Sequence, residues 1–222
     1  MKERPILFKG EMVRAILDGR KTQTRRVCKS RLDIDFRGGG GVDGLDWNNP
    51  SAWGFEDEDG TNWGLKADDY CGIREIPCPH GQIGDQLWLR ESFYHVKSSD
   101  TFFYRADQKP VSAIVDRSLR ENFAYHRTQA STNFQPPIFM PRCASRIQLE
   151  ITNVRVERLQ DISEEDARDE GVSVPTALGV LAEHYPGPKH KIAFQGLWDS
   201  INADKHPWES NPWVWCISFR RI

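Results

Sequence analysis

The sequence of 222 residues lacks the features of a membrane, secreted or duplex-coating protein. No apolar stretch approaches the roughly 18 residues that a membrane helix needs, and the N-terminal MKERPILFKG has no apolar run of signal-peptide length. The formal net charge is only −2, whereas proteins that coat duplex nucleic acid are usually basic, because their affinity comes from neutralising phosphates. We therefore expect a soluble, cytoplasmic protein that neither binds membranes nor coats DNA.

The chain also lacks closely spaced cysteines. Its five cysteines are an odd number and scattered, which excludes the disulfide framework of a small secreted protein. Cys71, Cys78 and His80 carry groups that zinc favours, but they do not form the CxxC pair of zinc ribbons and fingers. A structural zinc at these three residues is thus an alternative to ordinary cytosolic thiols, and we expect no metal or cofactor. Cys143 and Cys216 fall in expected core strands, where they would simply pack.

Aromatic residues, in contrast, are abundant, with eight tryptophans among them. Such rings either fill a core or stack on nucleobases, and the 38 % of hydrophobic residues suffices for one sizeable core. We predict a single domain over residues 1–222 with two long insertions, at about 30–80 and 97–138. The first insertion contains four consecutive glycines at 38–41 and an acidic stretch, and the second ends near a Gln-Pro-Pro turn signal.

Periodicity predicts about five or six strands and about three short helices around these insertions. Strands are expected at 5–8, 21–27, 86–93, 146–156 and 213–219, and helices at 10–18, 161–170 and 194–201. Ser163 is the expected N-cap of the second helix, and a change of parity at Thr152 and Asn153 predicts a bulge or a tight turn. Strands interrupted by helices favour a closed or partly closed barrel, although periodicity alone does not separate this from another α+β fold.

Four segments, taken in their order along the chain, resemble the ASCH family of PUA-like proteins. They are GRKTQTRR at 19–26, GDQLWLRE at 84–91, the capped helix at 161–171 and the closing strand at 213–219. The chain is most similar to the ASCH proteins of bacteriophages and prophages, over about residues 4–27, 81–93, 139–172 and 194–222. The resemblance implies an α+β fold, a PUA-like (ASCH) β-barrel of about five or six strands with short flanking helices.

The resemblance also implies a site for a nucleobase or a modified nucleoside. One bacterial branch of the family hydrolyses N4-acetylcytidine with a Lys, a Thr three residues later and a Glu on the helix after the central strand, and the matching positions here are Lys21, Thr24 and Glu170. In such an amidohydrolase Thr24 attacks the acyl carbon, Lys21 accepts its proton, and Glu170 protonates the leaving nitrogen or activates water. Residues 21 and 24 of a regular strand point to opposite faces, so the pair converges only if Lys21 precedes the strand or the strand is bulged.

Basic residues near the same segments suggest a second role. They would form a phosphate-binding rim beside a base pocket, and the candidates are Arg20, Arg25, Arg26, Arg90, Arg142 and Arg146. The alternative to such a rim is a solvated, charged face. Two other functions therefore stay open, a non-catalytic module that binds single-stranded RNA, and a ribonuclease that uses Lys21 and Glu170 as acid and base. The two insertions either gate the pocket or bind a partner protein, and the sequence does not say which, so protein partners stay unknown.

Overall fold

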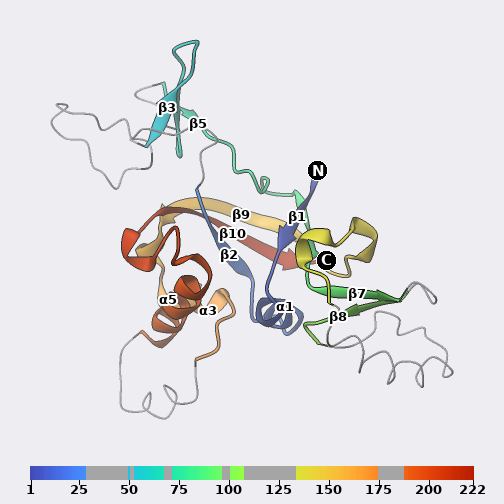
Figure 1. The fold of residues 1–222 in the computed structure, drawn as a ribbon. Helices are drawn as coiled ribbons and strands as arrows, with labels where there is room; N and C mark the ends of the chain where they lie inside the picture. The colour runs from blue at the N-terminus through green and yellow to red at the C-terminus, as the bar shows by residue number, and fades with distance from the viewer. Residues whose placement is uncertain (29–49, 51–52, 68–71, 97–100, 108–133, 175–187) are drawn as a thin grey trace.

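The computed structural model of the chain describes residues 1–28, 50, 53–67, 72–96, 101–107, 134–174 and 188–222. Much of both expected insertions, including the four glycines and Cys71, lies outside these residues. Within them the fold is a mixed α+β arrangement dominated by strands, as expected (Figure 1). No helix of the described residues is long and apolar enough to cross a membrane.

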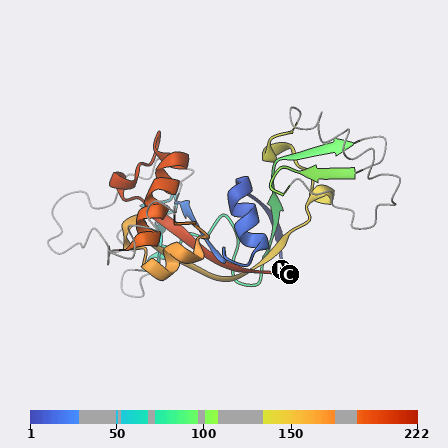
Figure 2. The ribbon, with the colours of Figure 1, turned by 90° about the horizontal axis from the view of Figure 1, so that it is seen from below.

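The central sheet of the described residues has five strands. They are β1 (Glu3–Leu7), β2 (Gln23–Val27), β6 (Gln86–Arg90), β9 (Gln148–Arg158) and β10 (Trp213–Arg221). Their order is β1-β6-β9-β10-β2, with β1 parallel to β6 and the other pairs antiparallel. Figure 2 shows that the sheet is strongly curved. Its edge strands β1 and β2 are not paired with each other in the described part, so the barrel expected from the sequence is not seen to close there.

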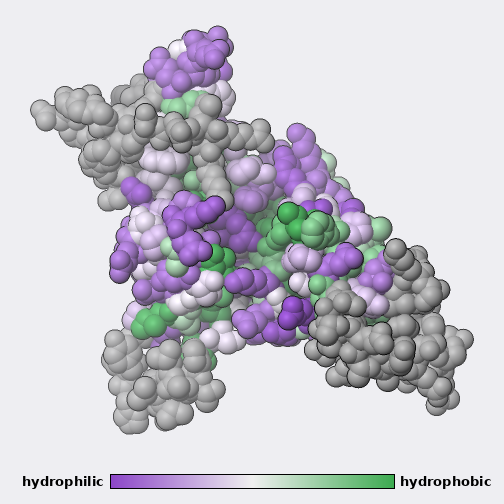
Figure 3. All heavy atoms as spheres, in the orientation of Figure 1, coloured by the Kyte–Doolittle hydropathy of each residue, from purple (hydrophilic) through white to green (hydrophobic). Residues whose placement is uncertain are grey.

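A second sheet, a separate hairpin and four short 3₁₀ helices accompany the central sheet in the described residues. A second sheet contains β3 (Gly54–Glu56), β4 (Asn62–Gly64) and β5 (Arg74–Glu75), and a hairpin contains β7 (Phe93–Val96) and β8 (Thr101–Tyr104). Short 3₁₀ helices lie at η2 (Pro137–Phe139), η3 (Arg142–Ala144), η4 (Leu159–Asp161) and η5 (Trp208–Ser210). Hydrophobic atoms gather at the surface over η2, where Ile138 and Phe139 are exposed (Figure 3).

The three expected helices are present. They are α1 (Gly10–Leu17), α3 (Glu164–Asp169) and α5 (Lys189–Asn202). Helix α3 begins at Glu164 rather than at 161, and α5 begins at Lys189, five residues before the predicted start. The chain leaves α1 through Gly19, whose φ of 73° is costly for other residues. Ser163 caps α3, because its hydroxyl accepts a hydrogen bond of 3.0 Å from the backbone N–H of Asp166.

Strand β10 separates two hydrophobic clusters, which explains the unbroken apolar run of its first five residues. Trp213, Trp215, Ile217 and Phe219 pack into the cluster that also contains residues of α1, and Val214 and Cys216 pack into the cluster beneath α3 and α5. Trp198 and Trp208 also belong to the second cluster. Together with Trp213 and Trp215 of the first cluster, four of the eight tryptophans therefore lie in these two clusters.

Several strand positions differ from the expected ones. The expected strand at 86–93 ends at Arg90, and Phe93 begins a separate hairpin. Lys21 precedes β2 rather than belonging to it. Cys143 lies exposed in η3, so its predicted place in a core strand is wrong, whereas Cys216 is buried in β10 as expected.

The parity change near Thr152 is a β-bulge. Asn153 pairs with Ser218, but the next pair joins Ile151 to Phe219, so Thr152 is an extra residue in β9. The bulge changes which residues of β9 face the core. Leu149 and Ile151 face it before the bulge, and Val154 and Val156 pack against it beyond the bulge.

Replacing Gly171 with alanine is expected to lower the free energy of unfolding by about 2 kcal/mol. Gly171 has a φ of 77°, and a methyl group there would lie 2.7 Å from Lys21 Cβ and 2.8 Å from Ala15 Cβ. Chemical denaturation measures the change, with Gly196→Ala as the matched control. Gly196 lies in the interior of α5 with open space around it, so alanine there should raise the stability by up to about 1 kcal/mol. A Gly171→Ala protein as stable as the wild type would contradict this account.

Candidate functional site

The segment between α1 and β2 is joined to the end of α3. The backbone N–H of Lys21 donates to Ala15 O over 3.0 Å, and that of Thr22 donates to Asp169 O over 2.9 Å. Lys21 and Glu170 form an isolated antiparallel bridge, although 149 positions separate them in the sequence. Glu170 is the C-cap of α3, and Gly171 then turns the chain away. Lys21 therefore precedes the strand, which is one of the two conditions under which it and Thr24 can serve the same site.

The ammonium group of Lys21 is buried and has an acceptor for each of its three N–H bonds. It donates to Gln23 O over 2.8 Å, to Glu170 O over 2.9 Å and to Glu170 Oε2 over 2.6 Å. Burial lowers the pKa of Lys21, the Glu170 carboxylate opposes this, and the cations of Arg26 and Arg25 lower it again. The net result is a lysine that loses its proton more readily than an exposed lysine does.

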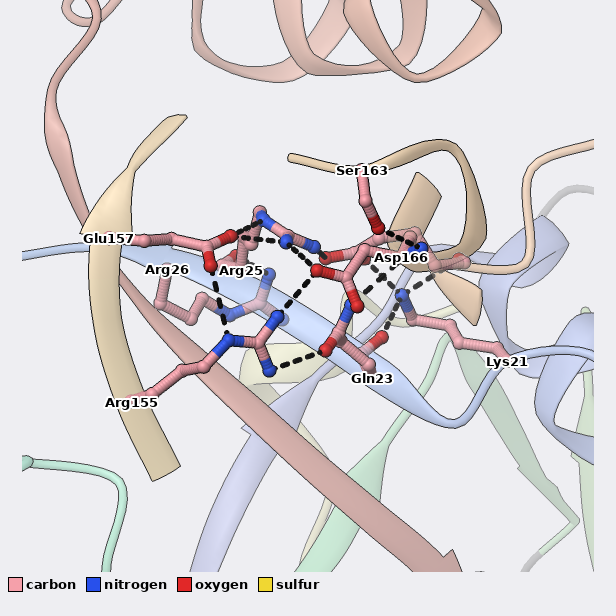
Figure 4. Close-up of polar contacts among 9 residues, drawn as sticks. Lys21, Gln23, Arg25, Arg26, Arg155, Glu157, Ser163 and Asp166 are labelled. Atoms are coloured by element: carbon pink, nitrogen blue, oxygen red, sulfur yellow. Dashed lines mark hydrogen bonds and ion pairs between the residues drawn. The ribbon is translucent and has the colours of Figure 1, made fainter. Parts of the chain in front are cut away.

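Arg25 holds the other oxygen of Glu170. Its side chain is fully buried, and Nη1 donates to Glu170 Oε1 over 3.3 Å. The same guanidinium pairs with Glu157 on β9 and with Asp166 on α3, the latter over 3.0 Å. Arg155 completes the network, because it pairs with the same two carboxylates, over 3.1 Å and 2.5 Å respectively. Figure 4 shows the side chains of Arg25, Arg155, Glu157 and Asp166 converging from β2, β9 and α3.

A cavity of about 620 Å³ opens beside this network, between β2 and α5. Its lining includes the polar residues Thr24 and Glu170 and, from α5, the apolar residues Phe194, Leu197 and Trp198. The other lining residues are Met12, Arg25, Arg26, Val27, Pro79, His80, Ile201, Asn202, Asp204, Lys205 and His206. Lys21 does not line the cavity and lies behind Glu170, so Glu170 connects the buried amine to the space where a ligand would bind.

Two nitrogen-bearing side chains at the cavity retain capacity to bind a ligand. Among the described residues Arg26 has no carboxylate partner, since its guanidinium donates to Leu7 O over 2.9 Å and lies 5.2 Å from the Phe8 ring. Burial lowers the pKa of His80 to about 4, and the cations of Arg26 and Arg4 act in the same direction. At neutral pH His80 is therefore an uncharged imidazole that can both donate and accept a hydrogen bond.

His80 is the cavity residue that the sequence assigned to a different role. Its imidazole, taken with the thiols of Cys71 and Cys78, suggested a zinc ligand, and only the folded chain brings it to the cavity that Arg26 and Thr24 line. Cys71, the first member of the predicted zinc set, lies outside the described residues. Among the residues that are described, no three His, Cys, Asp or Glu side chains gather as a metal site.

The six predicted rim arginines lie in several separate places. Arg25 and Arg26 line the cavity, and Arg20 lies nearby, where it pairs with Asp18 and donates to Gly171 O. Arg90 and Arg142 instead flank the Trp88 ring, at 4.7 Å and 5.9 Å from its centroid.

Arg146 is neutralised away from the cavity. It forms a two-pronged ion pair with Glu91, over 2.8 Å and 3.0 Å, and pairs with Asp107 over 2.6 Å. Its guanidinium also covers the Tyr104 ring at 4.1 Å. Of the six arginines, Arg26 therefore has the clearest access to a ligand in the cavity.

No family model, no curated protein and no solved structure matches this chain. The resemblance to the ASCH family therefore rests on the four sequence segments quoted above.

Substituting Glu170 with glutamine is expected to lower the free energy of unfolding by about 3–5 kcal/mol, because Lys21 and Arg25 would keep buried charges without their shared partner. Equilibrium unfolding in urea measures this loss. Glu150→Gln is the control, since it removes a surface ion pair with Arg220 and should change stability by less than about 1 kcal/mol. If both substitutions lowered the free energy of unfolding equally, the Glu170 carboxylate would not be what stabilises the buried charges of Lys21 and Arg25.

Proposed function

We propose that the cavity between β2 and α5 binds a nucleobase or nucleoside, and that Lys21, Thr24 and Glu170 hydrolyse an acyl amide on it, of the N4-acetylcytidine type. One observation carries this proposal. Glu170 binds Lys21 through a hydrogen bond of 2.6 Å and lines the same cavity as Thr24, so the three residues implied by the ASCH resemblance belong to one site. Lys21 and Glu170 lie 149 positions apart in the sequence, so nothing in their spacing required them to meet.

The cavity has suitable properties for such a ligand. Its volume of about 620 Å³ lies within the range of about 300–1,000 Å³ that small-molecule sites occupy. The apolar wall of Phe194, Leu197 and Trp198 suits the face of a base. His80 and Arg26 supply hydrogen-bonding groups at its edge, and a few such groups fix a ligand's orientation.

The reaction begins when Lys21 is a neutral amine. As the Thr24 hydroxyl attacks the acyl carbon, its proton passes by way of Glu170 Oε2 to Lys21 Nζ, and a tetrahedral oxyanion forms that the Arg26 cation stabilises. The carbon–nitrogen bond then breaks, and the leaving nitrogen takes the proton from Lys21 by way of Glu170 Oε2. Water then attacks the acyl-Thr24 ester while its proton passes to Glu170. Glu170 returns that proton to the Thr24 oxygen as the carboxylic acid leaves, which restores the Thr24 hydroxyl and the Glu170 carboxylate.

The charge distribution favours a small ligand over an extended strand of RNA. A phosphate-binding rim needs cations that are not already neutralised. Arg25 and Arg146 are each paired with at least two carboxylates, and Arg142 is paired with Glu3. A site for one base uses Arg26 and the cavity wall, and does not need such a rim.

Thr24→Ala is expected to reduce the release of cytidine from N4-acetylcytidine by at least about a hundredfold, because it removes the attacking hydroxyl. Chromatography of the products measures turnover, and calorimetry tests whether the variant still binds the nucleoside. Thr22→Ala is the control, since that side chain is exposed beside the site and turnover should persist.

If folded wild-type protein binds RNA but releases no cytidine, the binding-module alternative holds. If Thr24→Ala retains RNA cleavage, the protein is a ribonuclease.

The rate of this hydrolysis is expected to rise with pH and then level off. The pKa of Lys21 lies below its ordinary value because of burial, so the charged, inactive amine predominates at low pH and the neutral base appears as pH rises through the folded-state pKa. His80, with a pKa of about 4, contributes no step near neutral pH. Measurement of kcat from neutral to alkaline pH tests this, and a rate that falls as pH rises would exclude Lys21 as the base.

A further inference from the structure

A second cavity, the α1 cavity, has a volume of about 770 Å³ and opens over the start of α1. Figures 1 and 2 both show α1 between α5 and the hairpin of β7 and β8. The residues that line the α1 cavity come from these three parts of the fold and their flanks, and they include Phe8, Lys9, Arg14, Ser92, Arg105 and Leu197. The α1 cavity therefore lies across the start of α1, between α5 and the base of the hairpin.

The α1 cavity adjoins the cavity between β2 and α5. Leu197 of α5 lines both of them. Arg26 lines the cavity between β2 and α5, and its guanidinium contacts Leu7 and Phe8, which line the α1 cavity. A further cavity of about 480 Å³ shares lining residues with each of the two. A ligand that is bound between β2 and α5 can therefore extend past Leu197 and Phe8 toward α1.

The lining of the α1 cavity carries an excess of positive charge. It contains three cations, Lys9, Arg14 and Arg105, and one carboxylate, that of Glu11. Within the described part of the chain none of the three cations is paired with a carboxylate. A site for phosphate needs cations that are not already neutralised. These three meet that condition, whereas most of the rim arginines predicted from the sequence do not.

Two of the polar groups are fixed by backbone contacts. Arg14 Nη1 donates to Ala106 O over 2.6 Å, which leaves the other N–H groups of this guanidinium available to a ligand. The backbone N–H of Arg105 donates to Ser92 O over 2.9 Å, so these two residues lie together at the base of the hairpin. The hydroxyl of Ser92 has no partner among the described residues. Guanidinium, ammonium and hydroxyl groups around one space are the donors that phosphate oxygens accept from.

We propose that the α1 cavity binds the phosphate of a nucleotide whose base lies in the cavity between β2 and α5, so that the substrate is a nucleoside phosphate rather than a free nucleoside. This inference rests on the proposed function for the place of the base. The resemblance to the ASCH family does not imply it, since Arg105 belongs to the second insertion and lies outside the segments that carry the resemblance.

Calorimetric titration of the full chain with cytidine and with its 5′- and 3′-monophosphates tests the phosphate site. We expect the better of the two monophosphates to bind at least about tenfold more tightly than cytidine, because it adds charge-assisted hydrogen bonds. This advantage should shrink as salt is added, since the cations are exposed to solvent.

The double variant Lys9→Gln/Arg105→Gln locates the phosphate. Both side chains are exposed and neither has a partner among the described residues, so the fold should persist. The variant should lose most of the advantage of the monophosphate over cytidine. Lys66→Gln is the matched control, because it removes an exposed lysine beside β4, outside all three cavities, and should leave the advantage unchanged.

Turnover provides a second readout. With the N4-acetylated form of the better monophosphate, the double variant should raise KM by about tenfold and leave kcat unchanged, because the phosphate is remote from the scissile bond and contributes equally to the ground state and the transition state. A drop in kcat without a change in KM would overturn the phosphate role of these residues.

A short oligonucleotide that contains cytidine identifies the source of the phosphate. If it binds no more tightly than the monophosphate, the α1 cavity serves a free nucleotide. If it binds more tightly and the gain is lost in Lys9→Gln/Arg105→Gln, the cavity serves a phosphodiester of a strand. Either result supports the phosphate site.

The failure of this inference is distinguishable from the failure of the proposed function. Equal affinities for cytidine and both monophosphates would overturn the phosphate site and leave the nucleoside site intact. A preference for the monophosphate that persists in the double variant would also overturn it, because the phosphate would then bind elsewhere. If the wild type binds no cytidine derivative, the proposed function fails and titration with inorganic phosphate decides the inference. Binding that is lost in the double variant would support an anion site at α1, and no binding would overturn it.

Discussion

Lys21 and Glu170 form the buried ion pair at the centre of the contacts between the start of β2 and the end of α3. The central sheet reaches the site from one side through β2, and α3 reaches it from the other. An ion pair inside a protein stabilises only when its geometry offsets the loss of hydration. Here each N–H of Lys21 has an acceptor, and both oxygens of Glu170 have a donor. Gly171 makes this approach possible, because a side chain at that position would overlap Lys21 and Ala15.

The same interaction connects stability to chemistry. Burial, and to a smaller extent the cations of Arg26 and Arg25, lower the pKa of Lys21, which is unfavourable for a purely structural ion pair and useful for a base. Arg25 links that property to β9 and α3 through Glu157 and Asp166. The charge state of Lys21 is therefore a property of the whole network rather than of the pair alone.

The cavity takes its shape from α5. Phe194 and Trp198 anchor the helix on the second hydrophobic cluster, and the same two side chains also line the cavity. Polar groups from β2 and from the segment around His80 face this wall. No single sequence motif predicts this cavity, because its lining residues come from segments that are distant in the sequence.

Local patterns in the sequence determined the helices, the Ser163 cap, the bulge at Thr152 and the buried strand β10. Each of these depends on neighbours within a few residues or on a regular alternation, so periodicity was sufficient to predict it. Only the tertiary structure decided the open order of the sheet, the neutralisation of Arg25 and Arg146, and the place of His80 in the cavity. Whether an arginine meets a phosphate or a carboxylate depends on side chains brought close by folding, such as Glu157, which lies 132 positions from Arg25 in the sequence. Spacing within a segment contains no information about such a partner.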